Sequence, residues 1–105
     1  MTYEEFEENV EKINEEYNHK WTVSGDSVLV VRDEENCPLA DISRKTWLTH
    51  SFDYVAFREL PAEEKGDLFC LVFTLSRTFL EERLGGNRRN DNIRRIWKRN
   101  RKNIQ

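Results

Sequence analysis

The 105-residue chain is polar, with 37% hydrophobic and 35% charged residues and a formal net charge of −3. A chain of this length is expected to form one domain with a modest core. Its longest apolar run is much shorter than the ~20 residues that cross a bilayer, and its acidic start lacks the basic and apolar regions of a secretory signal. We therefore expect a cytoplasmic protein whose cysteines, Cys37 and Cys70, are reduced thiols.

The charge is unevenly distributed along the chain. Residues 1–84 hold 19 acidic and nine basic residues, a balance of −10, whereas residues 85–105 hold one acidic and eight basic residues, a balance of +7. This asymmetry predicts a domain over residues 1–86 followed by a basic arm over residues 87–105. Such arms often bind phosphate or acidic protein surfaces. A simpler alternative is that the arm docks on the acidic domain of its own chain or of a homodimer mate.

An amphipathic helix is predicted over residues 2–18. Thr2 and Glu5 have the spacing of a capping box, and apolar residues recur at 3-4-3-4 spacing, namely Tyr3, Phe6, Val10, Ile13 and Tyr17. We expect this apolar seam to dock on the core. The acidic face could serve solubility alone, or it could imitate a phosphate backbone towards a basic partner. Its candidate partner-binding residues are Glu4, Glu8, Glu11 and Glu15.

Short strands are predicted after this helix. Residues 21–23, 28–31 and 39–43 are rich in β-branched and other apolar side chains, and turn-forming residues separate them. Successive short strands joined by tight turns favour an antiparallel meander. Residues 46–49 could form a fourth, edge strand or an ordered loop, and we favour the strand.

The connection over residues 51–59 is unusually aromatic, with Phe52, Tyr54 and Phe57 beside Val55. We expect these side chains to plug the end of the core between the sheet and the following helix. The alternative is an exposed aromatic patch that binds a protein partner.

The densest apolar run predicts one long helix over residues 60–84. Pro61 suits its first turn and Gly85 with Gly86 its end. Two adjacent stripes run along it: Leu68, Val72, Leu75 and Phe79 in one, and Phe69, Phe73, Leu80 and Leu84 in the other. A helix that is apolar this widely is normally buried. Cys70 within it is expected to be a buried, inert thiol.

A set of residues around the start of this helix carries a resemblance. It consists of Phe52, Asp53, Ala56, Phe57, Arg58, Glu59, Leu60, Pro61, Glu63, Glu64 and Lys65, with Glu81, Glu82 and Arg83 at the helix end. Together they resemble a family of small proteins encoded by phages and prophages of Gram-positive bacteria. The resemblance covers roughly residues 50–84. It implies a mobile-element protein that acts in interactions or counter-defence, for example as an anti-CRISPR protein, and it assigns no functional residue.

The arm has the composition of a short basic helix. Asn90 or Asp91 could cap it, and Ile93, Ile96 and Ile104 form a thin apolar stripe. Arginine predominates, which suits bidentate contacts to phosphate or carboxylate. Trp97 could stack on a nucleic-acid base or anchor the helix to the domain, and we favour anchoring. The candidate partner-binding residues of the arm are Arg88, Arg89, Arg94, Arg95, Trp97, Lys98, Arg99, Arg101 and Lys102.

No motif indicates catalysis or a cofactor. The chain has no P-loop, no GxGxxG, no nucleophile elbow and no HExxH. His19 and His50 lack neighbours at metal-ligand spacing, and a Cys37–His50 nucleophile pair would need the fold to bring the two residues together. We therefore expect a protein that is not an enzyme and binds no metal or cofactor.

These observations predict an α+β fold with an N-terminal helix, a three- to four-stranded antiparallel meander, a long buried helix and a short basic C-terminal helix. The favoured function is inhibition of a host defence factor, such as a CRISPR–Cas nuclease, by protein–protein contact through charged surfaces. The alternative is a nucleic-acid-binding accessory protein that contacts DNA or RNA through the arm. A third hypothesis is an assembly protein that oligomerises by arm-to-domain contact.

Overall fold

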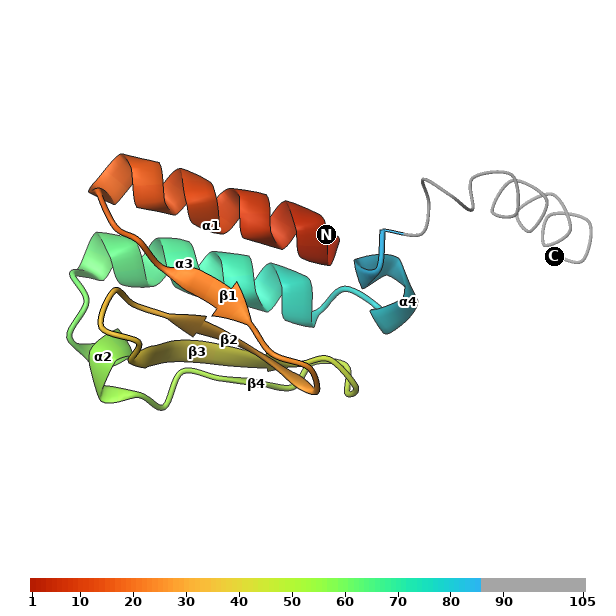
Figure 1. Cartoon of the computed structure of the whole chain (residues 1–105). Coiled ribbons are helices and arrows are strands. Elements are labelled where there is room, and N and C mark those ends of the chain that lie inside the picture. Colours follow the sequence, from red (N-terminus) through yellow and green to blue (C-terminus); the bar gives the residue numbers. More distant parts are fainter. Residues whose placement is uncertain (86–105) are drawn as a thin grey trace, which may run out of the picture.

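The structure is a computed structural model that describes residues 1–85, so the basic arm and its candidate residues lie outside the described part. Two long helices, α1 and α3, lie side by side over one face of a four-stranded antiparallel sheet (Figure 1). The strand order is β1-β2-β3-β4, as expected of a meander. The predicted α+β fold is confirmed. Within residues 1–85 no helix is long and apolar enough to span a membrane.

Helix α1 (Tyr3–Tyr17) begins at the predicted capping box. The hydroxyl of Thr2 accepts the Glu5 N–H at 3.0 Å, and the Glu5 carboxylate accepts the Thr2 N–H at 2.8 Å. The helix ends at Asn18, whose left-handed conformation (φ 59°) an asparagine tolerates. Three residues of the predicted seam are buried in the core, namely Phe6, Val10 and Ile13.

The sheet consists of β1 (Thr22–Ser24), β2 (Val28–Arg32), β3 (Pro38–Ser43) and β4 (His50–Ser51). Its helix-facing side is apolar: Leu29 lies opposite Ile42 and Val31 opposite Ala40, and all four are buried. Consecutive residues of a regular strand point to opposite faces, yet Leu39 and Ala40 are both buried. The register shift at this point of the β2–β3 ladder is a β-bulge, which turns both side chains towards the core.

The turn between β1 and β2 requires a glycine. Gly25 has φ 134°, and a Cβ at this position would lie 1.8 Å from the carbonyl oxygen of Val28. No other residue fits this backbone conformation without a rearrangement of the turn.

The fourth strand is not where we predicted it. Residues 46–48 form a turn, with Leu48 in a left-handed conformation (φ 58°), and β4 follows at His50–Ser51. The polar groups of the turn bind the end of α3 instead of a neighbouring strand. The Trp47 indole N–H donates to the Arg77 carbonyl at 2.8 Å, and the Leu48 N–H donates to the Ser76 carbonyl at 3.0 Å.

The single long helix predicted over residues 60–84 is also wrong. The structure divides it into α3 (Ala62–Ser76) and α4 (Leu80–Arg83). A continuing helix would donate its own N–H groups to the carbonyls of its last turn. Here the Ser76 and Arg77 carbonyls accept hydrogen bonds from the turn over residues 46–48, so α3 ends without loss of hydrogen bonding.

A fully buried arginine completes this helix end. The Arg83 guanidinium donates to the carbonyls of Ser43 at 2.7 Å, Ser76 at 2.9 Å and Thr78 at 3.0 Å. It also lies 6.0 Å from the ring centroid of Tyr3 in α1. A cation at the C-terminal end of α3 is favourable because it faces the negative end of the helix dipole. Arg83 thus joins α1, α3, α4 and the end of β3.

The expected burial of the long helix is only half correct. Leu68, Val72 and Leu75 of the first stripe are buried, but Phe69 and Phe73 of the second stripe are 47% and 38% exposed. Cys70 is exposed as well, so the prediction of a buried thiol is wrong. The reason is geometric: α3 contacts the sheet and α1 on one side, and the opposite side faces outwards.

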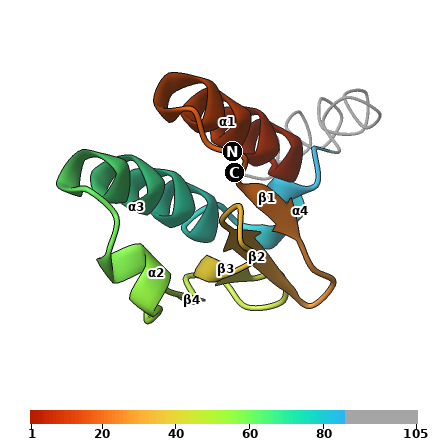
Figure 2. The same cartoon turned by 60° about the vertical axis from the view of Figure 1, so that its left-hand side comes forward.

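Phe52 and Phe57 plug the core as we expected, whereas Val55 is 59% exposed, and part of this connection forms an unpredicted short helix, α2 (Val55–Arg58). Phe52 packs against Phe57 and Phe69, with ring centroids 4.7 and 5.2 Å apart, and Phe52 and Phe57 lie half-buried against the core. Figure 2 shows α2 on the opposite side of α3 from α1. The Tyr54 hydroxyl donates to the Asp41 carboxylate of β3, which raises the Tyr54 pKa to about 12.

Candidate functional site

The four glutamates predicted to bind a partner lie together on α1. Glu4, Glu8, Glu11 and Glu15 are all exposed. Their 4-3-4 spacing places them on one side of the helix, opposite the buried seam. We call these four residues the α1 acidic face. Within α1 only Lys12 is basic, so the exposed side of this helix is strongly negative.

A shallow groove runs between this helix and β1. One part has a volume of about 420 Å³ and is lined by Glu11, Asn14, Glu15, His19, Lys20, Trp21 and Thr22. A second part of about 280 Å³ is lined by Glu7, Val10, Glu11, Trp21, Thr22 and Val23. The two parts share Glu11, Trp21 and Thr22, so they form one depression along α1. Its rim carries acidic side chains, and its floor includes the buried Trp21.

Asn14 fixes α1 to the start of β1. Its side-chain oxygen accepts the Trp21 N–H at 2.9 Å, and its side-chain nitrogen donates to the Trp21 carbonyl at 3.0 Å. One amide therefore satisfies both backbone groups of a residue that is 3% exposed. This pair holds the α1 acidic face in a defined position over the sheet edge.

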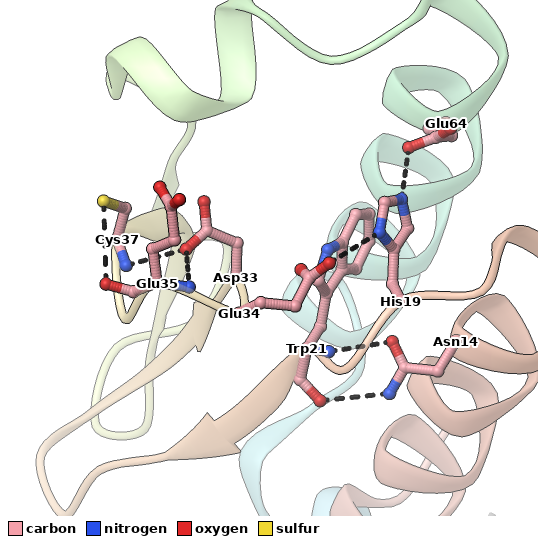
Figure 3. A network of polar contacts seen from close by, with 8 residues as sticks. All are labelled: Asn14, His19, Trp21, Asp33, Glu34, Glu35, Cys37 and Glu64. Atoms are coloured by element: carbon pink, nitrogen blue, oxygen red, sulfur yellow. Dashed lines mark hydrogen bonds and ion pairs between the residues drawn. The ribbon is translucent and has the colours of Figure 1, made fainter.

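His19 lines the groove and connects three segments of the chain. Figure 3 shows its contacts with Glu34 and Glu64. Its Nε2 lies 2.7 Å from a Glu64 carboxylate oxygen of α3, and its Nδ1 lies 3.1 Å from a Glu34 oxygen in the β2–β3 turn. The imidazole stacks on Trp21, with centroids 4.8 Å apart and planes 16° apart. The contacts join the α1–β1 connection, the β2–β3 turn and the first turns of α3.

The two carboxylates favour the protonated form of His19. Partial burial by itself lowers the pKa of this imidazole, but the hydrogen bonds and negative charges of Glu64 and Glu34 raise it more. The pKa therefore lies above the ordinary value of 6.5. A protonated His19 donates from both ring nitrogens and bridges the two glutamates.

Tyr17 makes a further link between the two helices. Its hydroxyl donates to the Asp67 carboxylate of α3 at 2.6 Å. This hydrogen bond, together with desolvation and the charge of Asp67, raises the pKa of Tyr17 above its ordinary value. The phenol therefore stays neutral at physiological pH and acts as a structural donor.

The structure does not bring together the residues that we weighed for catalysis. The Cys37 thiol is exposed and faces the Glu35 carbonyl at 3.9 Å, whereas the His50 Nδ1 lies 2.8 Å from the Ser76 hydroxyl. Among residues 1–85 no group of three or more His, Cys, Asp and Glu side chains is arranged to hold a metal ion.

Sequence reasoning missed the structural roles of two polar residues, His19 and Arg83. Glu34 and Glu64 lie 15 and 45 residues from His19 along the chain, so no spacing indicates that they meet. Arg83 was grouped with charges at the helix end, and only the break after α3 carries its side chain into the core.

Among the residues that carry the resemblance to small phage proteins, two pairs contact each other within the connection that precedes α3. Arg58 forms a 3.1 Å ion pair with Asp53, and Phe57 packs on Phe52.

We compared the chain with protein-family models, with curated proteins and with solved structures, and none of them matches it.

Proposed function

We propose that this chain is a non-enzymatic, phage-type binding protein that inhibits a host defence factor, such as a CRISPR–Cas nuclease, in the host cytoplasm. In this proposal the α1 acidic face occupies a basic surface on which the factor binds nucleic acid. The observation that carries the proposal is the row of exposed carboxylates on one rigid helix. The resemblance over residues 50–84 to small phage proteins supports the choice of a defence factor.

The charge density of α1 is comparable to that of a nucleic-acid strand. Seven exposed glutamates lie between residues 4 and 16, namely Glu4, Glu5, Glu7, Glu8, Glu11, Glu15 and Glu16. At 1.5 Å per residue this segment spans about 18 Å, or roughly one carboxylate per 3 Å. A DNA strand carries one phosphate per ~3.4 Å. A basic groove that recognises phosphate mainly by charge would therefore meet a similar density of negative charge on this helix.

Such a surface has two physical advantages as a competitor. Its charge steers association with a basic partner, with a rate that falls as salt rises. The helix that carries it is also fixed to the rest of the fold by Asn14, Tyr17 and His19, so little backbone conformational entropy is lost when it binds.

The test is a triple charge reversal on the α1 acidic face, Glu8→Lys with Glu11→Lys and Glu15→Lys. These residues face away from the core, so the variant should fold. The readout is interference against phage or plasmid in a bacterium with an active CRISPR–Cas nuclease, followed by cleavage assays with the purified nuclease. We expect the original chain to suppress interference and the triple variant to lose suppression.

The matched control reverses three exposed acidic residues elsewhere, with Asp26→Lys, Glu35→Lys and Glu59→Lys. It changes the net charge by the same amount, so it separates a local surface from a global charge effect. Equal loss of suppression in both variants would contradict a role for α1, and absence of suppression by the original chain would contradict inhibition of that nuclease.

The second candidate function is nucleic-acid binding through the arm, which the balance of +7 over residues 85–105 favours. Its test is a salt-titrated DNA and RNA binding assay on the full chain and on Arg94→Glu with Arg95→Glu and Arg99→Glu. Binding that weakens steeply with salt and disappears in this variant would favour the arm over the α1 acidic face.

A further inference from the structure

The outward side of α3 carries a regular seam of its own. Five residues recur at 3-4-3-4 spacing, namely Glu63, Gly66, Cys70, Phe73 and Arg77, and all are exposed. This spacing keeps them on one side of the helix, opposite the buried Leu68, Val72 and Leu75. We call these five residues the α3 outer seam.

The flank of this seam that faces the aromatic plug is apolar, whereas the other flank exposes Asp67 and Thr74. Phe73 and its neighbour Phe69 are 38% and 47% exposed, and their rings are parallel, with centroids 6.0 Å apart. Phe69 in turn contacts Phe52, so the exposed rings continue into the half-buried aromatic plug. A helix with apolar residues on both sides is typical of one that is buried on both sides. Contiguous exposed apolar surface marks an association site.

Gly66 supports close contact at the same place. A glycine inside an exposed helix is unfavourable because it increases the entropy of the unfolded chain. A Cβ added at Gly66 would meet nothing within 4 Å, so the packing of residues 1–85 gives no steric reason for a glycine here. The absence of a side chain becomes useful if another molecule approaches the helix at this point.

The charges of the seam select the occupant and its direction. The seam has an acidic residue, Glu63, at its N-terminal end and a basic residue, Arg77, at its C-terminal end, seven residues either side of Cys70. The ion pairs found within residues 1–85 involve neither of them. A parallel copy of α3 would place like charges together at both ends, whereas an antiparallel copy places opposite charges together.

We propose that the α3 outer seam binds the α3 outer seam of a second copy of this chain, in an antiparallel pair with the two-fold axis beside Cys70. In this register Glu63 lies opposite Arg77 of the partner subunit, and the symmetry repeats that contact at the other end. Phe73 of the partner subunit lies over Gly66, where the missing side chain makes room for the ring. This one arrangement accounts for the opposite charges at the two ends of the seam, for the glycine in the helix and for the exposed phenylalanine.

This inference is independent of the proposed function, because the α1 acidic face lies on the other long helix and points away from the core. Two copies paired through α3 would present two acidic faces. The dimer could therefore be tested and rejected without any consequence for the inhibitor proposal.

The first measurement is the mass of the full chain across a concentration series, by native mass spectrometry and sedimentation. We expect a monomer–dimer equilibrium. Glu63→Arg and Arg77→Glu should each weaken the dimer by about tenfold or more, because symmetry places like charges at both ends of the seam. The double variant should restore the dimer, although both changes oppose the helix dipole and would lower fold stability together.

Cysteine cross-linking tests the register directly. In the Cys37→Ser variant, mild oxidation should form a disulfide between the Cys70 thiols of the two copies. In the Cys70→Ser variant, which keeps Cys37, oxidation should form no disulfide within the dimer. Gly66→Leu should weaken the dimer without loss of folded structure, because the monomer has room for the side chain.

Three results would overturn the proposal. The first is a monomer at every concentration, which would leave residues 86–105 or another protein as the occupant of the seam. The second is a dimer that Gly66→Leu and the two single charge reversals leave unchanged. The third is a double charge variant that is no better than either single variant.

Discussion

Helices α1 and α3 have the same length and lie side by side, but they expose opposite chemistry. Each contains 15 residues. The outward side of α1 is acidic, whereas the outward side of α3 presents Phe69, Cys70 and Phe73. The two helices contribute to one core, so the difference concerns what each one offers to other molecules. The surface of α1 is typical of a helix that binds by electrostatic attraction. The surface of α3 is typical of a helix that binds by burying apolar side chains.

The largest expected effect on stability distinguishes a residue on the core side of the two helices from a residue on their outward side. Phe6→Ala, which empties a fully buried site on α1, should lower the free energy of unfolding by about 3–5 kcal/mol. Phe69→Ala on α3 should lower it by less than about 1 kcal/mol, because the ring is already half in water. Urea denaturation at low protein concentration measures both. Similar losses would mean that the outward side of α3 is part of the monomer core.

The next largest effect on stability concerns Arg83, which joins the start of α1 to the end of α3. Arg83→Met keeps a similar volume but removes the guanidinium hydrogen bonds to the Ser43, Ser76 and Thr78 carbonyls, of which Ser76 still accepts the Leu48 N–H. We expect a loss of about 2–4 kcal/mol. Arg58→Met, which removes an exposed ion pair with Asp53, is the control and should cost less than about 1 kcal/mol. Equal effects would contradict a structural role for the buried guanidinium.

A smaller effect distinguishes how the two helices begin. α1 has a side-chain cap and α3 has none. Thr2→Ala should therefore lower the free energy of unfolding by about 1 kcal/mol, whereas Thr2→Ser should preserve the cap. Thermal and urea unfolding monitored by circular dichroism provide the measurement. The prediction fails if the serine variant is destabilised as much as the alanine variant.

The smallest effect depends on pH and involves the link between the α1–β1 connection and α3. Because the pKa of His19 is raised in the folded state, its contribution to stability is fully present below about pH 6.5 and is lost as pH rises through the folded value. His19→Gln should lower the free energy of unfolding near pH 6 by up to about 1 kcal/mol, since Glu34 is partly solvated. The difference should shrink towards pH 9.

Two control variants test the origin of this pH dependence. Glu64→Gln and Glu34→Gln remove the carboxylates that raise the His19 pKa, so each should reduce the difference between pH 6 and pH 9. Added salt should reduce it too. A difference between the original chain and His19→Gln that is constant from pH 6 to pH 9 would show that His19 acts through stacking on Trp21 and not through charge.

The contrast between the two helices also explains how much of the fold could be predicted. The start and the seam of α1 depend on residues three or four positions apart. The turns around Gly25 and Asn36 are also local, and both residues have a positive φ (134° and 67°). These local patterns were sufficient for α1, for three strands and for their order. The end of α3 and the place of β4 depend on hydrogen bonds from Trp47 and Leu48 to residues 30 and 28 positions away, and no local pattern contains that information.

In the candidate site, too, features that depend on local spacing could be predicted, whereas features that depend on distant residues could not. The exposure of Glu4, Glu8, Glu11 and Glu15 follows from their position opposite the seam, so it could be predicted. The network of His19 could not, since its partners come from a turn and from a distant helix. The exposure of Phe73 was missed because two apolar stripes on one helix do not reveal which of them is covered.

The buried Arg83 also affects how the chain reaches its folded state. Its guanidinium lies against Tyr3, and the amino group of Met1 lies 3.3 Å from the Thr78 hydroxyl, so the first residues of the chain contact Thr78 and Arg83 near the end of the described part. During synthesis α1 is made first, but its last contacts are made only after Arg83 has emerged from the ribosome. A shortened chain that stops after α3 would still contain the apolar core, yet its helix end would lack the cation. The domain is therefore expected to fold as one unit after residue 83 is available, and not helix by helix as it is made.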